Sequence, residues 1–192
     1  VDALLADIEN KLYRSVYYSE GQLFISPEEF RSGLLEIRKL VVEQNQSLYV
    51  EELDSLLNKL HVFGFYFATL DIRQNSKIHD KAIEALVTEF PDHFPQGYLA
   101  LTDAEKTTAL DLVTKSVNVY EIANADAKST LESMLAMREI QNQSSEMGCD
   151  RYIISSNDSA LDVLETLAMF RLAGWEKPAV DIVPLLEAVD DL

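Results

Sequence analysis

The sequence predicts a predominantly helical α/β fold that contains about three parallel strands. Three short apolar runs end on polar or charged residues, at residues 63–76, 152–158 and 178–187. Runs of this length are too short to cross a membrane, and their apolar character is typical of strands buried inside a parallel sheet. Most of the remaining sequence repeats apolar residues at helical spacing, which predicts that helices form the bulk of the molecule.

Three helices are expected before the first strand, at residues 3–19, after Ser26, and at residues 49–61. Each segment places large aliphatic side chains on one helical face. The second helix has a specific start signal. Ser26 can cap it, Pro27 suits its first position and Glu29 can complete a capping box.

The first strand is expected over residues 63–76, buried on both faces and ending in a polar corner. Helices are then expected at about residues 76–90, 102–116 and 126–143. Ser76 is a candidate cap for the first of these helices, and Thr102 with Glu105 forms a capping box for the second.

The same pattern of strand, polar corner and helix then recurs. Residues 152–154 predict a short buried strand, after which Ser159 or Asp158 can cap a helix that ends at Gly174. Residues 178–186 predict the third strand. The spacing between the second and third strands is that of a βαβ unit, which implies parallel pairing.

Length and charge limit the classes of protein to consider. The 192 residues suffice for one domain, with residues 1–61 as a helical prelude and residues 62–192 as its strand-and-helix portion. The net charge of −17 argues against binding to nucleic acid or to an anionic membrane surface, since both require clustered Lys and Arg.

Cys149 is the single cysteine, so the chain can form neither an intramolecular disulfide nor a thiolate metal site. A reduced, cytoplasmic setting is therefore expected. The sequence begins without methionine and stops soon after a strand-like run, which leads us to expect a piece of a longer polypeptide.

Arg73 and Glu187 are the main candidates for chemistry, because each lies near the end of a predicted strand. In barrels of alternating strands and helices, such positions face the active-site mouth. The Arg73 guanidinium suits carboxylate, bicarbonate or phosphate, but a structural salt bridge to Asp71 or to an acid on a neighbouring strand explains it equally well. Glu187 suits a divalent cation, or else the acidic first turn of a helix, the role preferred for Asp190 and Asp191.

Other polar residues are weaker candidates. His79 shares a face with apolar side chains and is expected to pack in the core, and no two histidines have metal-ligand spacing. Cys149 is expected to be inert. The corner at residues 155–157 could donate hydrogen bonds to a ligand, although such a corner more often caps the next helix. The sequence contains no glycine-rich phosphate-binding loop.

Three segments resemble phosphoenolpyruvate carboxylase, in the order and at the approximate spacing of that family. Residues 70–76, followed by His79, resemble its LDIRQ segment. Residues 152–155 and 159–164 are similar to its YIIS and SDVL segments, and residues 183–192 to its PLFETLDDL motif. Asn75 stands where the family pattern leads us to expect Glu, and Leu186 where it leads us to expect Phe.

The resemblance implies an enzyme that carboxylates phosphoenolpyruvate with bicarbonate to give oxaloacetate and phosphate, using Mg²⁺ or Mn²⁺. It implies a parallel, TIM-like barrel elaborated with many helices and completed by the remainder of its own chain, usually in a homotetramer. By this resemblance, Glu187 matches a metal-binding glutamate, and Arg73 matches a catalytic arginine that binds substrate. Most of the family's catalytic residues lie outside this sequence, so the isolated chain is expected to be inactive and to expose apolar barrel edges.

Two alternatives stay open at this point. One is another metal-dependent barrel enzyme that acts on a phosphorylated or enolisable acid. The other is a non-catalytic, acidic, helical interaction module in which Arg73 and Glu187 are structural. The module would have a complete core and no truncated sheet.

Overall fold

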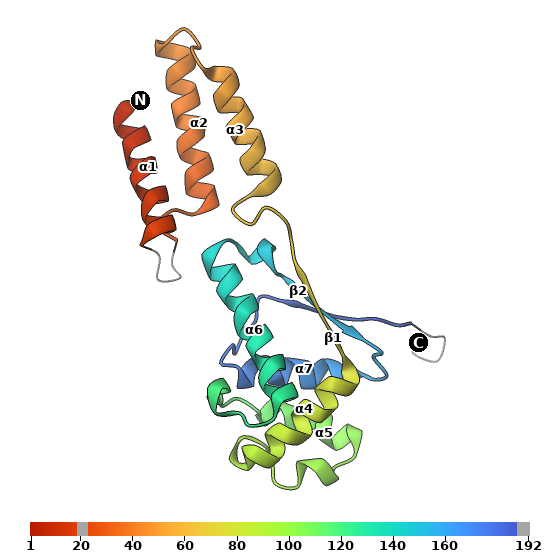
Figure 1. Cartoon of the computed structure of the whole chain (residues 1–192). Helices are drawn as coiled ribbons and strands as arrows, with labels where there is room; N and C mark the ends of the chain where they lie inside the picture. Colours follow the sequence, from red (N-terminus) through yellow and green to blue (C-terminus); the bar gives the residue numbers. More distant parts are fainter. Residues whose placement is uncertain (19–22, 188–192) are drawn as a thin grey trace. The chain divides into compact units, whose positions relative to one another are not determined.

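The computed structural model describes residues 1–18 and 23–187, which fold into two compact units. The first unit contains Val1–Thr69 and Glu139–Gly148, and the second contains Leu70–Arg138 and Cys149–Leu192. Helices predominate, and a small parallel sheet lies in the second unit (Figure 1). The predicted α/β, mostly helical class is therefore confirmed. No helix among the described residues combines the length and apolar character needed to cross a membrane.

The first unit is built on three amphipathic helices, α1 (Asp2–Tyr17), α2 (Pro27–Gln44) and α3 (Val50–Phe63). The predicted capping box of Ser26 and Glu29 is present at the start of α2. The helices bury one shared apolar cluster, formed by Ile8, Ile25, Phe30, Leu34, Ile37, Val41 and Leu60.

The prediction of a buried strand over residues 63–76 was wrong in its first half. Helix α3 continues to Phe63, and Gly64 ends it with a φ of 52°. The aromatic rings that follow pack locally. Phe65 contacts Phe30 at 5.8 Å between ring centroids, and Phe67 stacks on Phe63 at 5.2 Å. The aromatic part of the run therefore packs within the helical unit. Only its polar end forms a strand, and that strand is partly exposed rather than buried on both faces.

Three parallel strands form the sheet in the order β1 (Asp71–Asn75), β2 (Arg151–Ser155) and β3 (Asp181–Pro184). The register aligns Arg73 with Ile153 and Ile153 with Val183. Tyr152 and Ile154 are fully buried on one face of β2, whereas Ile153 on the opposite face is only partly buried. One face of the sheet is thus packed, and the other is more open.

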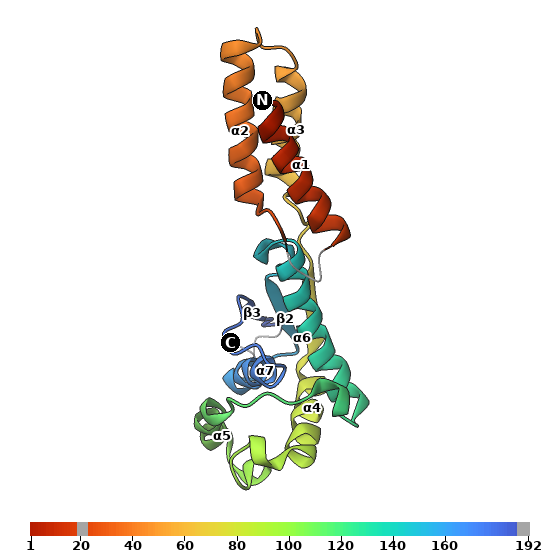
Figure 2. The same cartoon turned by 90° about the vertical axis from the view of Figure 1, so that its left-hand side faces the viewer.

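Helices α4 (Ser76–Glu89) and α7 (Ala160–Leu172) pack against each other and against the covered face of the sheet (Figures 1 and 2). The second unit also holds α5 (Asp103–Ala109) and the first part of α6 (Ala125–Gln143). Short 3₁₀ turns connect these elements at Pro91–His93, Tyr98–Ala100 (η2), Leu110–Leu112 and Val119–Glu121 (η4). A further one, Glu146–Gly148, lies in the first unit.

The end of α5 and the cap of α4 differ from the prediction. Helix α5 ends at Ala109 instead of continuing to Ser116, because Leu110 and Val113 turn into the core and the N–H of Val117 donates to the carbonyl of Leu172. Helix α4 is capped by the preceding residue, Asn75, rather than by Ser76 (see below).

Helix α7 matches its prediction more closely. Its cap is Ser159, one of the two candidates, which forms a capping box with Asp162. The helix ends at Leu172, and Gly174 takes a φ of 82° just after it.

His79 is fully buried between α7 and the sheet, as its apolar face predicted. Its Nε2 lies 3.0 Å from the hydroxyl of Tyr152, and its Nδ1 lies 3.2 Å from Oγ1 of Thr166. The Thr166 hydroxyl donates its proton to the carbonyl of Asp162 at 2.8 Å, so we assign the imidazole proton to Nδ1. Burial lowers the pKa of His79 to about 4, which keeps the ring neutral.

We expect His79 to stay neutral and Nδ1-protonated throughout the range in which an ordinary histidine titrates. Because the folded state binds this proton less readily than the unfolded state, the free energy of unfolding should fall as the pH drops from about 6.5 towards 4. Nitrogen-detected NMR of the imidazole ring, assigned with a His79→Gln variant, tests this expectation. An imidazolium signal from His79 at pH 6 would contradict it.

Candidate active site

The carboxyl ends of the three strands meet at one edge of the sheet, and polar side chains gather there. Arg73 belongs to β1, Ser156 directly follows β2, and Glu187 follows β3. Parallel pairing in this register places the three strand ends side by side. The structure therefore brings together the two candidate residues, which are separated by more than a hundred positions in the sequence.

The Glu187 carboxylate receives a hydrogen bond at each of its oxygens. Nη2 of Arg73 donates to Oε1 at 3.3 Å, and the backbone N–H of Ser156 donates to Oε2 at 3.0 Å. The side chains of Arg73 and Glu187 are 57% and 48% exposed, so a ligand from solvent can reach both. Asp71, the other partner considered for Arg73, instead pairs with Arg151 at 3.5 Å.

Ser156 belongs to the corner at residues 155–157, for which the sequence indicated possible hydrogen bonds to a ligand. Its backbone adopts a φ of 53°, which is uncommon for a residue with a side chain. Nδ2 of Asn75 donates to its hydroxyl oxygen at 3.0 Å, and the hydroxyl of Ser76 donates to its carbonyl. We call Arg73, Asn75, Ser76, Ser156 and Glu187 the strand-end cluster. The polar corner after β2 was visible in the sequence, but its contact with Glu187 was not, because that contact depends on strand register.

The described residues supply only part of a metal site. Within residues 1–18 and 23–187, no group of three or more His, Cys, Asp or Glu side chains is placed to hold a metal ion. Asp190 and Asp191 lie outside the described residues. Glu187 fits as one ligand, because Mg²⁺ commonly takes one or two carboxylates and completes its shell with water and substrate oxygens. Burial raises the pKa of the Cys149 thiol, which disfavours the reactive thiolate.

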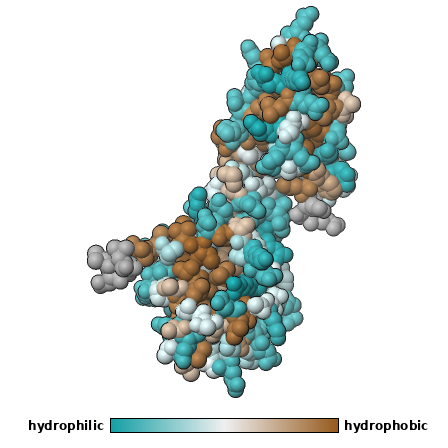
Figure 3. Space-filling view, turned by 180° about the vertical axis from the view of Figure 1, so that it is seen from behind, coloured by the Kyte–Doolittle hydropathy of each residue, from teal (hydrophilic) through white to brown (hydrophobic). Residues whose placement is uncertain are grey.

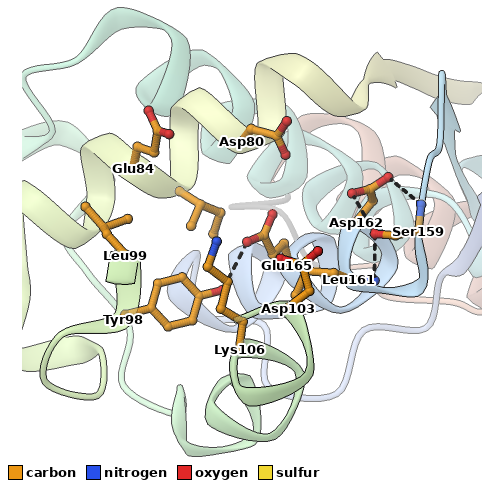
Figure 4. Close-up of a pocket in the computed structure, with 11 residues that line it drawn as sticks. Asp80, Glu84, Tyr98, Leu99, Asp103, Lys106, Ser159, Leu161, Asp162 and Glu165 are labelled. Carbon is orange, nitrogen blue, oxygen red and sulfur yellow. Dashed lines mark hydrogen bonds between the residues drawn. The ribbon is translucent and has the colours of Figure 1, made fainter. Parts of the chain in front are cut away.

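A second feature, a cavity of about 360 Å³, lies between α4, η2, α5 and α7 (Figure 4). Five of the eleven residues that line it are acidic, and Lys106 is the one basic residue among them. Glu165 is 4% exposed, and its Oε1 accepts a hydrogen bond of 3.0 Å from the hydroxyl of Tyr98. Burial raises the pKa of Glu165 to about 7, and neighbouring Asp80 and Asp162 add to the increase. The excess of carboxyl groups makes this cavity unfavourable for anionic ligands.

Comparison with known proteins decides the family of the chain. A family model for "Phosphoenolpyruvate carboxylase" matches residues 4–192. The chain belongs to the phosphoenolpyruvate carboxylase family. The resemblance of the three sequence motifs is thereby confirmed.

Curated relatives agree with this assignment. Phosphoenolpyruvate carboxylase from Parasynechococcus marenigrum is 34% identical over 183 residues, which cover 90% of this chain and 18% of the relative. The enzymes from Prochlorococcus marinus and Thermosynechococcus vestitus are 34% and 33% identical. They cover 88% and 91% of this chain, which in turn covers 17% and 18% of their length. The chain thus spans less than one fifth of these phosphoenolpyruvate carboxylases.

We expect Glu165→Gln to stabilise the chain at alkaline pH. A carboxyl group whose pKa is raised on folding contributes stability below its unfolded pKa, near 4.5, and loses that contribution as the pH rises through about 7. The amide never ionises and keeps an oxygen for Tyr98, so the variant should gain about 2–3 kcal/mol over the parent at pH 8 and little at pH 4. Urea unfolding across this range measures the difference. Glu105→Gln is the matched control, because a capping hydrogen bond lowers the pKa of Glu105, and an equal gain there would contradict the explanation.

We expect the ion pair between Arg73 and Glu187 to contribute little to folding. Both side chains are about half exposed, and exposed pairs typically contribute up to about 1 kcal/mol. A double-mutant cycle with Arg73→Ala and Glu187→Ala, followed by urea unfolding, gives the coupling free energy. A coupling above about 2 kcal/mol would favour the structural role of the pair.

Proposed function

We propose that this chain is part of a phosphoenolpyruvate carboxylase, a lyase that carboxylates phosphoenolpyruvate with bicarbonate to give oxaloacetate and phosphate. The observation that carries the proposal is the meeting of Arg73 and Glu187 at the carboxyl edge of a parallel sheet, in a chain of this family. Both substrates are anions, and Arg73 offers them a guanidinium that solvent can reach.

The open face of the sheet supports a TIM-like barrel in the complete enzyme. Parallel sheets are normally covered on both faces, yet Ile153 and Val183 on this face are only partly buried. On the side seen in Figure 3, apolar side chains gather on the surface of the second unit. Residues 62–192 would form part of the barrel, residues 1–61 would precede it as a helical prelude, and further strands from the remainder of the same polypeptide would close it.

The strand-end cluster suits distinct roles in this reaction. Arg73 would bind phosphate or bicarbonate oxygens and lower the energy of the negative charge that develops on them. Glu187 would be one ligand of Mg²⁺ or Mn²⁺, which would supply electrostatic stabilisation of the negative charge left when the phosphoryl group passes from phosphoenolpyruvate to bicarbonate. The N–H of Ser156 would keep the Glu187 carboxylate in place.

The isolated chain is proposed to be inactive, since one carboxylate is an incomplete metal site and the open sheet face needs covering. A cytoplasmic homotetramer is proposed for the complete enzyme on the family resemblance alone.

We expect Arg73→Ala and Glu187→Ala each to lower the kcat/KM of the full-length enzyme roughly 100-fold, by removing an anion-binding group and a metal ligand. Steady-state oxaloacetate production from phosphoenolpyruvate, bicarbonate and Mg²⁺ measures the effect.

Arg151→Ala and Asp71→Ala are the matched controls, because they break a similar exposed ion pair at the opposite end of the same strands. They should stay within about threefold of the parent. Full activity in the Arg73 and Glu187 variants would discard the proposed roles, and a folded parent without carboxylation would discard the proposed reaction.

A further inference from the structure

The backbone N–H of Ser156 donates to Glu187, and Ser156 itself holds an unusual conformation. A residue with a side chain seldom adopts a φ near 53° unless its surroundings hold it there. Two neighbours provide this restraint. Nδ2 of Asn75 donates to the Ser156 hydroxyl, and the Ser76 hydroxyl donates to the Ser156 carbonyl. The residue that carries the N–H is therefore held by groups at the end of β1.

Asn75 links this corner to a rigid element. Its Oδ1 accepts the N–H of Lys77 at 2.9 Å and so caps α4, while its Nδ2 holds Ser156 at 3.0 Å. One amide side chain is thus fixed at both ends, by the first turn of a 14-residue helix and by the corner after β2. Asn75 therefore ties the corner to α4, whose buried face includes His79.

The Glu187 carboxylate is held by hydrogen bonds from this corner and from β1. Ser156 donates to Oε2 and Arg73 donates to Oε1, so the carboxylate is oriented from β2 and from β1 at the same time. A carboxylate offers about four acceptor positions, and one that is oriented by donors at both oxygens can also ligate a cation. Groups that orient a metal ligand typically affect metal affinity 10- to 100-fold.

We propose that Asn75 and Ser156 are positioning residues that aim the Glu187 carboxylate at the divalent cation. This inference rests on the proposed function, which makes Glu187 a metal ligand. It also gives a role to Asn75, which stands where the family resemblance led us to expect Glu. An amide can donate to the Ser156 hydroxyl through Nδ2 while its oxygen caps the helix, whereas an ionised carboxylate has no donor.

The test is the affinity of the full-length enzyme for Mn²⁺ alone, measured by electron paramagnetic resonance of the free ion. The variant Asn75→Ser keeps a helix-capping oxygen but removes the amide that reaches Ser156. Ser156→Ala removes the other half of the same contact. Each should raise the Mn²⁺ dissociation constant roughly tenfold, and the double variant should be no worse than either single one. The KM for Mg²⁺ should rise similarly, with kcat at saturating Mg²⁺ little changed.

Asn118→Ala is the matched control, because Asn118 has the same two kinds of hydrogen bond at the start of η4, to the N–H of Tyr120 and to Glu121. It should leave the dissociation constant within about twofold. Unchanged affinity in both Asn75→Ser and Ser156→Ala, with a loss in Glu187→Ala, would overturn the positioning role and leave the proposed function standing. Unchanged affinity in Glu187→Ala as well would overturn the metal role and the inference together.

The variant Ser156→Gly tests the conformation of the corner, because glycine adopts a positive φ without strain. Ser156→Gly should bind Mn²⁺ more tightly than Ser156→Ala if the conformation of this residue matters.

Discussion

Parallel pairing of three short strands is the constraint on which the rest of the second unit depends. The pairing of β1, β2 and β3 fixes which residues stand at the carboxyl edge, and Arg73, Ser156 and Glu187 meet there although they are distant in the sequence. The same pairing leaves one face to be covered by α4 and α7 and the other face open. Parallel sheets are normally covered on both faces, whereas Ile153 and Val183 on the open face of this sheet are only partly buried.

In the strand-end cluster, a few hydrogen bonds connect exposed polar residues to a helix that is packed in the core. Exposed ion pairs contribute little stability, so the contact between Arg73 and Glu187 cannot by itself fix the carboxylate. The donors that restrain the corner after β2 come instead from Asn75 and Ser76, at the junction of β1 and α4. Because α4 is buried in the core through His79, Ala82, Ile83 and Leu86, the position of the cluster depends on packing below the surface.

The sequence was informative where local chemistry decides the structure. The predicted capping boxes at Ser26 and Thr102 formed because each needs only two residues, three positions apart. Ser159, one of two candidate caps, caps α7. The burial of His79 followed from its place on an apolar helical face. The first strand was misjudged for the opposite reason, since an apolar run such as residues 63–70 can serve a sheet or a helical core equally well. Its outcome was decided by tertiary contacts such as that between Phe65 and Phe30, which no local pattern specifies.

In the candidate site, too, some residues could be identified from the sequence and others could not. Arg73 and Glu187 were identifiable because charged residues that follow an apolar run can be recognised in the sequence alone. The contact of Ser156 with Glu187 was not foreseen, because it depends on the conformation of the corner and on the register of β2 beside β3. Glu165 could not be distinguished from the other acidic residues, 33 in all, since only the folded chain shows which carboxyl group is buried.

Glu165 and Glu187 also differ in how well they can bind a cation, because one is buried and the other is about half exposed. A carboxyl group that holds its proton near pH 7 competes poorly for a cation, whereas Glu187, about half exposed and contacted by charged and backbone donors, is accessible to one. The environment, rather than the residue type, therefore favours Glu187 over Glu165 as the metal ligand.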